Sequence, residues 1–159
     1  VKMDKFPITN QGYQQIEIEL KNLKSIERPS VIKSIAEARE HGDLSENAEY
    51  HAAKEKQSFI EGRIADLESK ISRAEVINTK KLKGDKIIFG ATVTLGDMDN
   101  KKNLIYQIVG TEEADVENGK ISISSPLAKA LLGKKTDDTV EVYSPGGSRE
   151  YQVEDIKFI

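Results

Sequence analysis

The sequence predicts an α+β protein, with an N-terminal antiparallel α-helical coiled-coil hairpin followed by a small α+β domain. Two observations lead to this prediction. Apolar residues recur every three or four positions up to about residue 78, whereas they alternate with polar residues from about residue 85. The period therefore changes from that of a helix to that of a strand. We predict domains over residues 1–80 and 81–159, with the boundary in the lysine-rich segment "TKKLKGDK" (79–86).

The first helical arm is predicted over residues 10–41, with Thr9 as its N-cap. Its apolar residues are Tyr13, Ile16, Leu20 and Leu23, and then Val31, Ile32, Ile35, Ala36 and Ala38. The register is interrupted near Arg28 and Pro29. Because proline removes a helical hydrogen bond, we expect a kink or short break there.

The second arm is predicted as one helix over residues 46–77, about 48 Å long at 1.5 Å per residue. Its heptad-spaced residues are Tyr50, Ala53, Gln57, Ile60, Ile64, Leu67, Ile71 and Ala74. Two helices joined by a short turn run antiparallel, so the arms form a hairpin with its turn near residues 42–45. Near that turn the expected seam contains only small residues, namely Ala36, Ala38, Ala48 and Ala52.

The remaining chain reads as strands separated by turns. The strands are "ATVTL" (91–95), "LIYQIV" (104–109), "ISIS" (121–124), "VEVY" (140–143) and "YQVEDIKFI" (151–159). One short helix fits "SPLAKALLG" (125–133), with Ser125 as N-cap, Pro126 at the first helical position and Gly133 after the end.

Composition excludes several functional classes. The chain has 159 residues, a net charge of −3 and no cysteine, so it has no disulfide, thiolate nucleophile or cysteine zinc site. No apolar run approaches the roughly 20 residues of a membrane helix, and "VKMDKFPITN" lacks the apolar core of a signal peptide. We therefore expect a cytoplasmic protein with no membrane partner. The acidic balance argues against a protein that wraps naked nucleic acid.

The turn "AREHGDLSENAEYH" (38–51) places acidic residues between two long helices. A structural explanation is sufficient for three residues of this turn. Gly42 can adopt positive φ and end the first arm. Asp43 can cap the second arm, and Glu46 can complete a capping box three residues later.

A functional explanation is compatible with the same geometry. Asp43 and Glu46 would lie together and exposed at the end of a rod. Mg²⁺ is commonly held by one or two carboxylates together with waters and phosphates. The pair could therefore complete a metal site that another protein begins, as in two-metal phosphoryl chemistry.

The basic residues around the turn also allow two readings. Arg39, Lys54 and Lys56 are ordinary solvated helix charges or a small patch that contacts a nucleic-acid phosphate. His41 and His51 do not match the HExxH spacing of a zinc site, and we interpret them as surface or hydrogen-bonded residues.

The segment "IAEAREHGDLSENAEYHAAKE" (35–55) resembles the hairpin tip of the bacterial Gre transcript cleavage factors. The resemblance continues through "EGRIADLESKISRAEVI" (61–77), "IIFGATVTL" (87–95), "ISISSPLAKALLGKK" (121–135) and "SPGG" (144–147). It implies a C-terminal FKBP-like domain that docks on bacterial RNA polymerase. It also implies that the hairpin enters the polymerase secondary channel and stimulates the polymerase's own endonucleolytic cleavage of backtracked nascent RNA.

The resemblance assigns roles to four residues. Asp43 and Glu46 match the carboxylates that such factors donate to the polymerase active site, where they share Mg²⁺ with the polymerase. Arg39 and Lys54 match the basic patch that meets the 3′ end of the nascent RNA. The resemblance implies an accessory factor rather than an enzyme, and we expect a monomer with no cofactor of its own.

Two other functions remain open at this stage. The first is an inhibitory Gre relative that blocks the same channel. The second is an FKBP-like prolyl isomerase or chaperone, which would need an apolar pocket rich in aromatic residues. The second domain offers Phe89, Tyr106, Tyr143, Tyr151 and Phe158, several of which are needed for its core.

Overall fold

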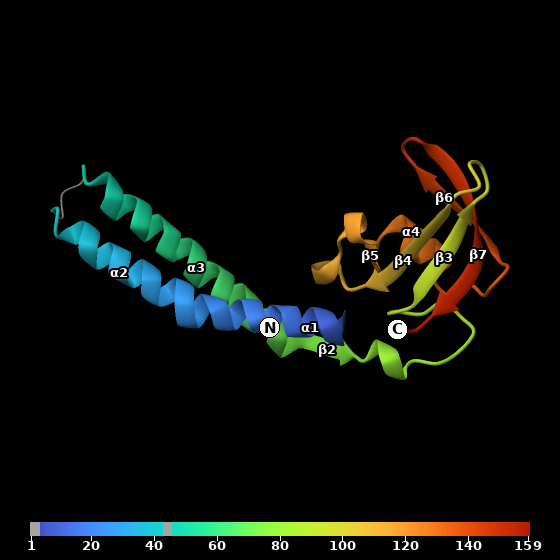
Figure 1. Ribbon diagram of the computed structural model, residues 1–159, viewed down its shortest axis with the longest axis horizontal. Helices are drawn as coiled ribbons and strands as arrows, with labels where there is room; N and C mark the ends of the chain where they lie inside the picture. Colours follow the sequence, from blue (N-terminus) through green and yellow to red (C-terminus); the bar gives the residue numbers. More distant parts are fainter. Residues whose placement is uncertain (1–3, 43–45) are drawn as a thin grey trace. The chain divides into compact units, whose positions relative to one another are not determined.

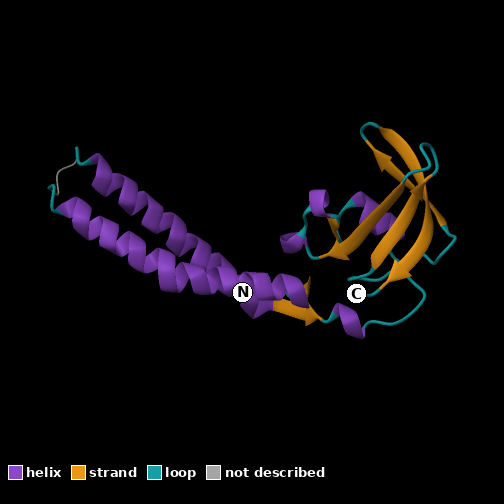
Figure 2. Ribbon diagram, in the orientation of Figure 1, coloured by secondary structure: helices purple, strands orange, loops and turns teal. Residues whose placement is uncertain are grey.

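The computed structural model describes residues 4–42 and 46–159, and it confirms the predicted α+β class. A helical hairpin and a mixed β-sheet account for most of the described chain (Figures 1 and 2). The chain forms two compact units. One is Tyr13–Ala74, which contains the hairpin, and the other joins the residues up to Gly12 with Glu75–Ile159.

The first arm of the hairpin remains helical across the expected break. It consists of α1 (Asn10–Asn22), a π-helical turn η1 (Leu23–Glu27) and α2 (Arg28–Arg39). Pro29 lies in the first turn of α2, directly after the π-turn, and the helix continues through it although proline lacks the N–H of a helical hydrogen bond. Widening to a π-turn therefore replaces the predicted break, and it keeps Leu23 and Val31 both buried although they lie one residue more than a heptad apart.

The second arm is α3 (Ala48–Arg73), which is shorter than predicted at both ends. The predicted helical residues Ala74–Ile77 instead form strand β2, which pairs with β1 (Phe6–Thr9). The β-branched Val76 and Ile77 favour a strand where a partner strand is available. This part of the helix prediction was wrong because the pairing partner is distant in sequence.

The hairpin is held by an apolar seam between α3 and the first arm, and α2 and α3 lie side by side (Figure 1). Its buried residues are Leu23, Val31, Ile60, Ile64 and Leu67, with Ile16 and Leu20 packed against them. This confirms most of the predicted heptad positions. The alanine seam near the turn was largely wrong, because Ala38 is buried but Ala36, Ala48 and Ala52 face solvent.

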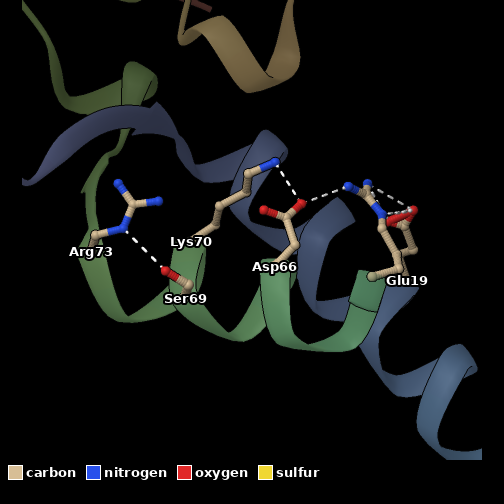
Figure 3. A network of polar contacts seen from close by, with 6 residues as sticks. Glu19, Asp66, Ser69, Lys70 and Arg73 are labelled. Carbon is tan, nitrogen blue, oxygen red and sulfur yellow. Dashed lines mark hydrogen bonds and ion pairs between the residues drawn. The ribbon is translucent and has the colours of Figure 1, made fainter. Parts of the chain in front are cut away.

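Ion pairs connect the two arms along the edges of the seam. Arg63 Nη2 lies 2.8 Å from Glu19 Oε2, and Arg63 also contacts Asp66, which in turn pairs with Lys70 (Figure 3). On the opposite edge, both carboxylate oxygens of Glu61 accept hydrogen bonds of 2.8 Å from Arg28. These hydrogen bonds lower the pKa of Glu61. Because exposed pairs contribute little free energy, they add only a small preference for the observed register of the arms.

The second unit contains a five-stranded mixed sheet in the order β5-β4-β3-β7-β6. Its strands are β3 (Thr92–Asp97), β4 (Asn103–Val109), β5 (Lys120–Ser122), β6 (Thr139–Ser144) and β7 (Gly147–Lys157). Each lies at or near a predicted strand. β4 and β5 are parallel, and the other neighbours are antiparallel.

Helix α4 (Pro126–Leu131) packs near β5 and β6 and closes the core of this unit. The predicted N-cap is confirmed, because Ser125 Oγ accepts a hydrogen bond of 3.2 Å from Ala128 N. Gly133 has a φ of +84°, as expected for the residue that ends this helix. The core residues are Ile87, Ala91, Val93, Leu95, Ile108, Ile121, Ala128, Leu131, Val140 and Val153.

Thr9 connects the start of α1 to the short helix η3 (Thr111–Glu113). Its Oγ1 accepts a hydrogen bond of 3.1 Å from Gly12 N, which confirms the predicted N-cap, and it also donates to the Glu113 carboxylate. The same carboxylate accepts from the backbone N–H groups of Thr9 and Gly110, each at 2.9 Å. A side chain at Gly12 would collide with the Glu113 side chain, so a larger residue there would displace this carboxylate.

Asp97 is a buried carboxylate at the β3–β4 turn. Its Oδ1 accepts a hydrogen bond of 2.8 Å from Asp99 N and a weaker one from Asn100 N, and its Oδ2 lies 2.6 Å from Arg149 Nη1. The Asp99 N–H, with the help of these other partners, holds the pKa of Asp97 below its ordinary value of 3.8. The ionised form is therefore favoured by folding.

Replacing Leu67 tests the seam. Leu67 is 1% exposed, and Leu67→Ala should lower the free energy of unfolding by about 2–5 kcal/mol because it removes buried apolar contacts and leaves a cavity. Denaturant titration followed by circular dichroism measures this loss. The control is Phe59→Ala on the same helix, where the side chain is 73% exposed and a change within about 0.5 kcal/mol is expected. Equal losses in both variants would contradict the proposed seam.

Replacing Asp97 tests the buried carboxylate. A depressed folded pKa stabilises the protein above the unfolded value, and this contribution disappears as pH falls below 3.8 toward the folded pKa. Asp97→Asn should therefore be less stable than wild type at neutral pH, and the difference should shrink in acid. Urea titrations at stepped pH measure this difference. Asp99→Asn, an exposed change in the same turn, is the control, and a pH-independent difference for Asp97→Asn would refute the linkage.

Candidate functional site at the hairpin tip

The tip is built from the end of α2 and the beginning of α3. Gly42 follows α2 with a φ of +120°, which confirms that it occupies a backbone region that favours glycine. The N-cap of α3 is Asn47, whose Oδ1 accepts a hydrogen bond of 3.0 Å from Tyr50 N. The predicted capping box is therefore wrong, because Glu46 precedes the cap and cannot be its third helical residue. Asp43 lies outside the described residues.

Asn47 also contacts the other arm. Its Nδ2 donates a hydrogen bond of 2.9 Å to the carbonyl oxygen of Ala38 and a second one to the carbonyl oxygen of Gly42. Sequence reasoning missed this residue because it assigned the cap to Asp43. Asn caps a helix about as well as Asp, and the position of Asn47 directly before the periodic residues of α3 was the available signal.

Glu46 is exposed in the turn immediately before this cap. Together with His41, Asn47, Ala48 and Glu49 it lines a hollow of about 450 Å³ at the helix ends. The beginning of α3 carries the positive end of the helix dipole, which favours carboxylates nearby. The structure thus presents a solvent-accessible carboxylate beside the end of a helix.

The predicted basic residues lie on both arms. Arg39 is the last residue of α2, and Lys54 lies within the first two turns of α3. Both are exposed, and Lys54 Nζ is 3.3 Å from Gln57 Oε1. Lys56 is exposed farther along α3. Cations from two different helices therefore lie near the turn that contains Glu46.

The two histidines are exposed, and the ring of His51 contacts Tyr50 edge-on with 5.6 Å between ring centroids. Among residues 4–42 and 46–159, no three His, Cys, Asp or Glu side chains converge on a point that could hold a metal ion. The Glu46 carboxylate is nevertheless the kind of ligand that Mg²⁺ takes, alongside waters and phosphates. Its exposed position fits a metal ion shared with another molecule.

Three of the five aromatic residues considered for an isomerase pocket serve the core of the second unit. Tyr106, Tyr151 and Phe158 pack against its buried cluster, whereas Tyr143 is 72% exposed. No helix in the described part of the chain is long and apolar enough to cross a membrane.

Comparisons with known proteins match both parts of the chain. Residues 6–76 match the family described as "Transcription elongation factor, N-terminal". Residues 81–158 match "Transcription elongation factor, GreA/GreB, C-term". These two matches together span most of the sequence.

Individual relatives agree with these matches. Transcription elongation factor GreA of Beijerinckia indica is 59% identical over 98% of this chain and 99% of its own length, and GreA of Rhodospirillum rubrum is 58% identical over the same shares. The solved structure of GreA factor homolog 1 of Thermus thermophilus is 32% identical and covers 96% of this chain and 99% of its own, with a TM-score of 0.44. The sequence matches are decisive: the chain belongs to the GreA/GreB family of transcription elongation factors.

Proposed function

We propose that this protein is a cytoplasmic transcript cleavage factor. It binds bacterial RNA polymerase, passes its hairpin tip through the secondary channel and stimulates the polymerase's own hydrolysis of backtracked nascent RNA. The observation that supports this most directly is the exposed Glu46 carboxylate at the end of a two-helix rod, in a chain of the GreA/GreB family. The second unit is the docking domain in this proposal.

For RNA hydrolysis, the proposal requires this protein to supply only carboxylate ligands for a metal ion. Mg²⁺, when bound jointly by the tip and the polymerase, would activate a water molecule and neutralise charge on the scissile phosphate. The role of Glu46, together with Asp43, is to supply carboxylate oxygens for that ion. In this proposal the rod supplies ligands only, so the protein is an accessory factor, and the catalytic centre is that of the polymerase.

Arg39 and Lys54 have a different role in the proposal. Their positive charges would bind a phosphate of the RNA 3′ segment and hold it beside the carboxylates. The same tip would then position both the RNA and the carboxylates that bind the metal ion. The buried seam supports both by keeping the two arms together.

The direct test is RNA cleavage in a halted, backtracked elongation complex, with and without the protein. The proposal predicts rapid removal of the RNA 3′ segment followed by renewed elongation, and no cleavage by the protein without polymerase. Slower elongation with no cleavage would instead identify an inhibitory channel binder. Cleavage by the purified protein alone would overturn the accessory role.

Glu46→Gln and Asp43→Asn test the proposed ligands. Each removes a negative charge, and neither alters the Asn47 cap. We expect stimulated cleavage to fall by about 100-fold or more, the scale seen when one charge-stabilising group is removed from an active site. Competition with wild type for polymerase should be unchanged. Glu49→Gln, in the first turn of α3, removes the same charge and should cleave normally. An equal loss in that control would indicate a general charge effect.

Arg39→Gln and Lys54→Gln test RNA placement. Each should reduce stimulated cleavage by about tenfold, since a hydrogen bond to a charged group is lost, and crosslinking of the tip to RNA should fall in parallel. Lys33→Gln is the control, because Lys33 is exposed on α2 and pairs only weakly with Glu37 at 4.0 Å. Normal crosslinking in the Arg39 and Lys54 variants would argue against an RNA contact.

A further inference from the structure

We infer that Asn47 is a positioning residue for the acidic tip, which it holds by joining both arms of the hairpin through one side-chain amide. The inference rests on the proposed function, because the group that it positions is the Glu46 carboxylate. Asn47 itself touches neither the RNA nor the metal ion in this proposal.

The Asn47 side-chain amide makes hydrogen bonds to both arms. Oδ1 accepts from Tyr50 N at 3.0 Å and thereby caps α3. Nδ2 donates to the carbonyl oxygens of Ala38, at 2.9 Å, and of Gly42. A side-chain amide has one acceptor oxygen and two N–H donors, so the acceptor side serves one arm and the donor side serves the other.

One of these bonds satisfies a group that a helix end leaves unpaired, because Tyr50 N–H lies in the first turn of α3. The Ala38 carbonyl already accepts from His41 N at 3.1 Å, so the bond from Asn47 Nδ2 is a second one, and it joins this carbonyl to the other arm. Ala38 is also the buried residue of the first arm closest to the turn, at 5% exposure. Beyond the end of the apolar seam, the hydrogen bonds of Asn47 join the two arms of the hairpin.

The position of Glu46 follows from this closure. Asn47 adopts an extended backbone with a φ of −75° and a ψ of 91°, and Glu46 is attached directly to it. If the two arms separate at their ends, the position of the carboxylate relative to α2 changes. A displacement of about 1 Å can reduce an enzymatic rate about 100-fold, so loss of the donor side of Asn47 should reduce stimulated cleavage through the position of Glu46.

Capping and positioning can be separated by substitution. Asp and Ser cap helices about as well as Asn, but a carboxylate has no donor and a serine hydroxyl is too short to serve both arms. Asn47→Asp and Asn47→Ser therefore keep the cap of α3 and remove the link to α2. They differ in charge, so a result common to both is due to the lost donor. Asn78→Asp is the matched control, because Asn78 caps the short helix Thr79–Lys81 by accepting from Lys80 N at 3.1 Å.

The experiment measures four properties of the full-length protein: helicity, competition with wild type for polymerase, cleavage rate at saturating protein, and the Mg²⁺ concentration for half-maximal cleavage. Both Asn47 variants should keep helicity and competition. Their saturated cleavage rate should fall between about 10- and 100-fold, and they should need more Mg²⁺, since a misplaced carboxylate holds the ion less well. Asn78→Asp should match wild type in all four.

Several results would overturn the inference. Normal cleavage by both Asn47 variants would show that the residue is only a cap. A defect in Asn47→Asp alone would show an effect of the added charge. Loss of helicity or competition in both would show a purely structural role, as would a lower rate with an unchanged Mg²⁺ requirement. If wild type itself stimulates no cleavage, the proposed function fails and the role of Asn47 fails with it.

Discussion

Burial of apolar side chains between the two arms is the interaction on which the rest of the hairpin depends. The seam formed by Leu23, Val31, Ile60, Ile64 and Leu67 holds helices that would be only marginally stable alone in water. Ion pairs such as Glu19–Arg63 contribute little free energy, so they add only a small preference for the observed register of the two helices over a shifted one. The seam therefore supplies most of the stability of the rod and most of its alignment.

The two ends of the hairpin are closed by different means. At the base, β1, which precedes α1, pairs with β2, which follows α3. At the tip, apolar contact ends at Ala38 and the Asn47 amide replaces it. A wide apolar end would add bulk to the tip, whereas a single amide closes it with few atoms. The tip can thus remain narrow and polar while its two arms stay joined.

Local periodicity predicted most of the fold, and failures occurred where distant partners decide the outcome. The heptads located the seam, and alternation located the sheet strands. Ala74–Ile77 was wrongly assigned to a helix because its partner, Phe6–Thr9, lies far away in sequence. At the tip, the carboxylate of Glu46 was enough to predict a possible metal ligand from residue type. Several polar residues could cap α3, however, and only the structure identifies Asn47 as the cap. The roles of Asp43, Glu46, Arg39 and Lys54 remain predictions, since they depend on a partner molecule.

The place of β7 in the sheet has a consequence for how the protein is made. β7 lies between β3 and β6, so the sheet cannot close until residues through Lys157 have left the ribosome. The hairpin seam, in contrast, uses residues no later than Ile71, and its contacts are comparatively local, which favours fast folding. During synthesis the rod can therefore form first, before β7 is available to pair with β3 and β6. Until then, their open edges are the surfaces that a nascent chain must keep from pairing with other strands.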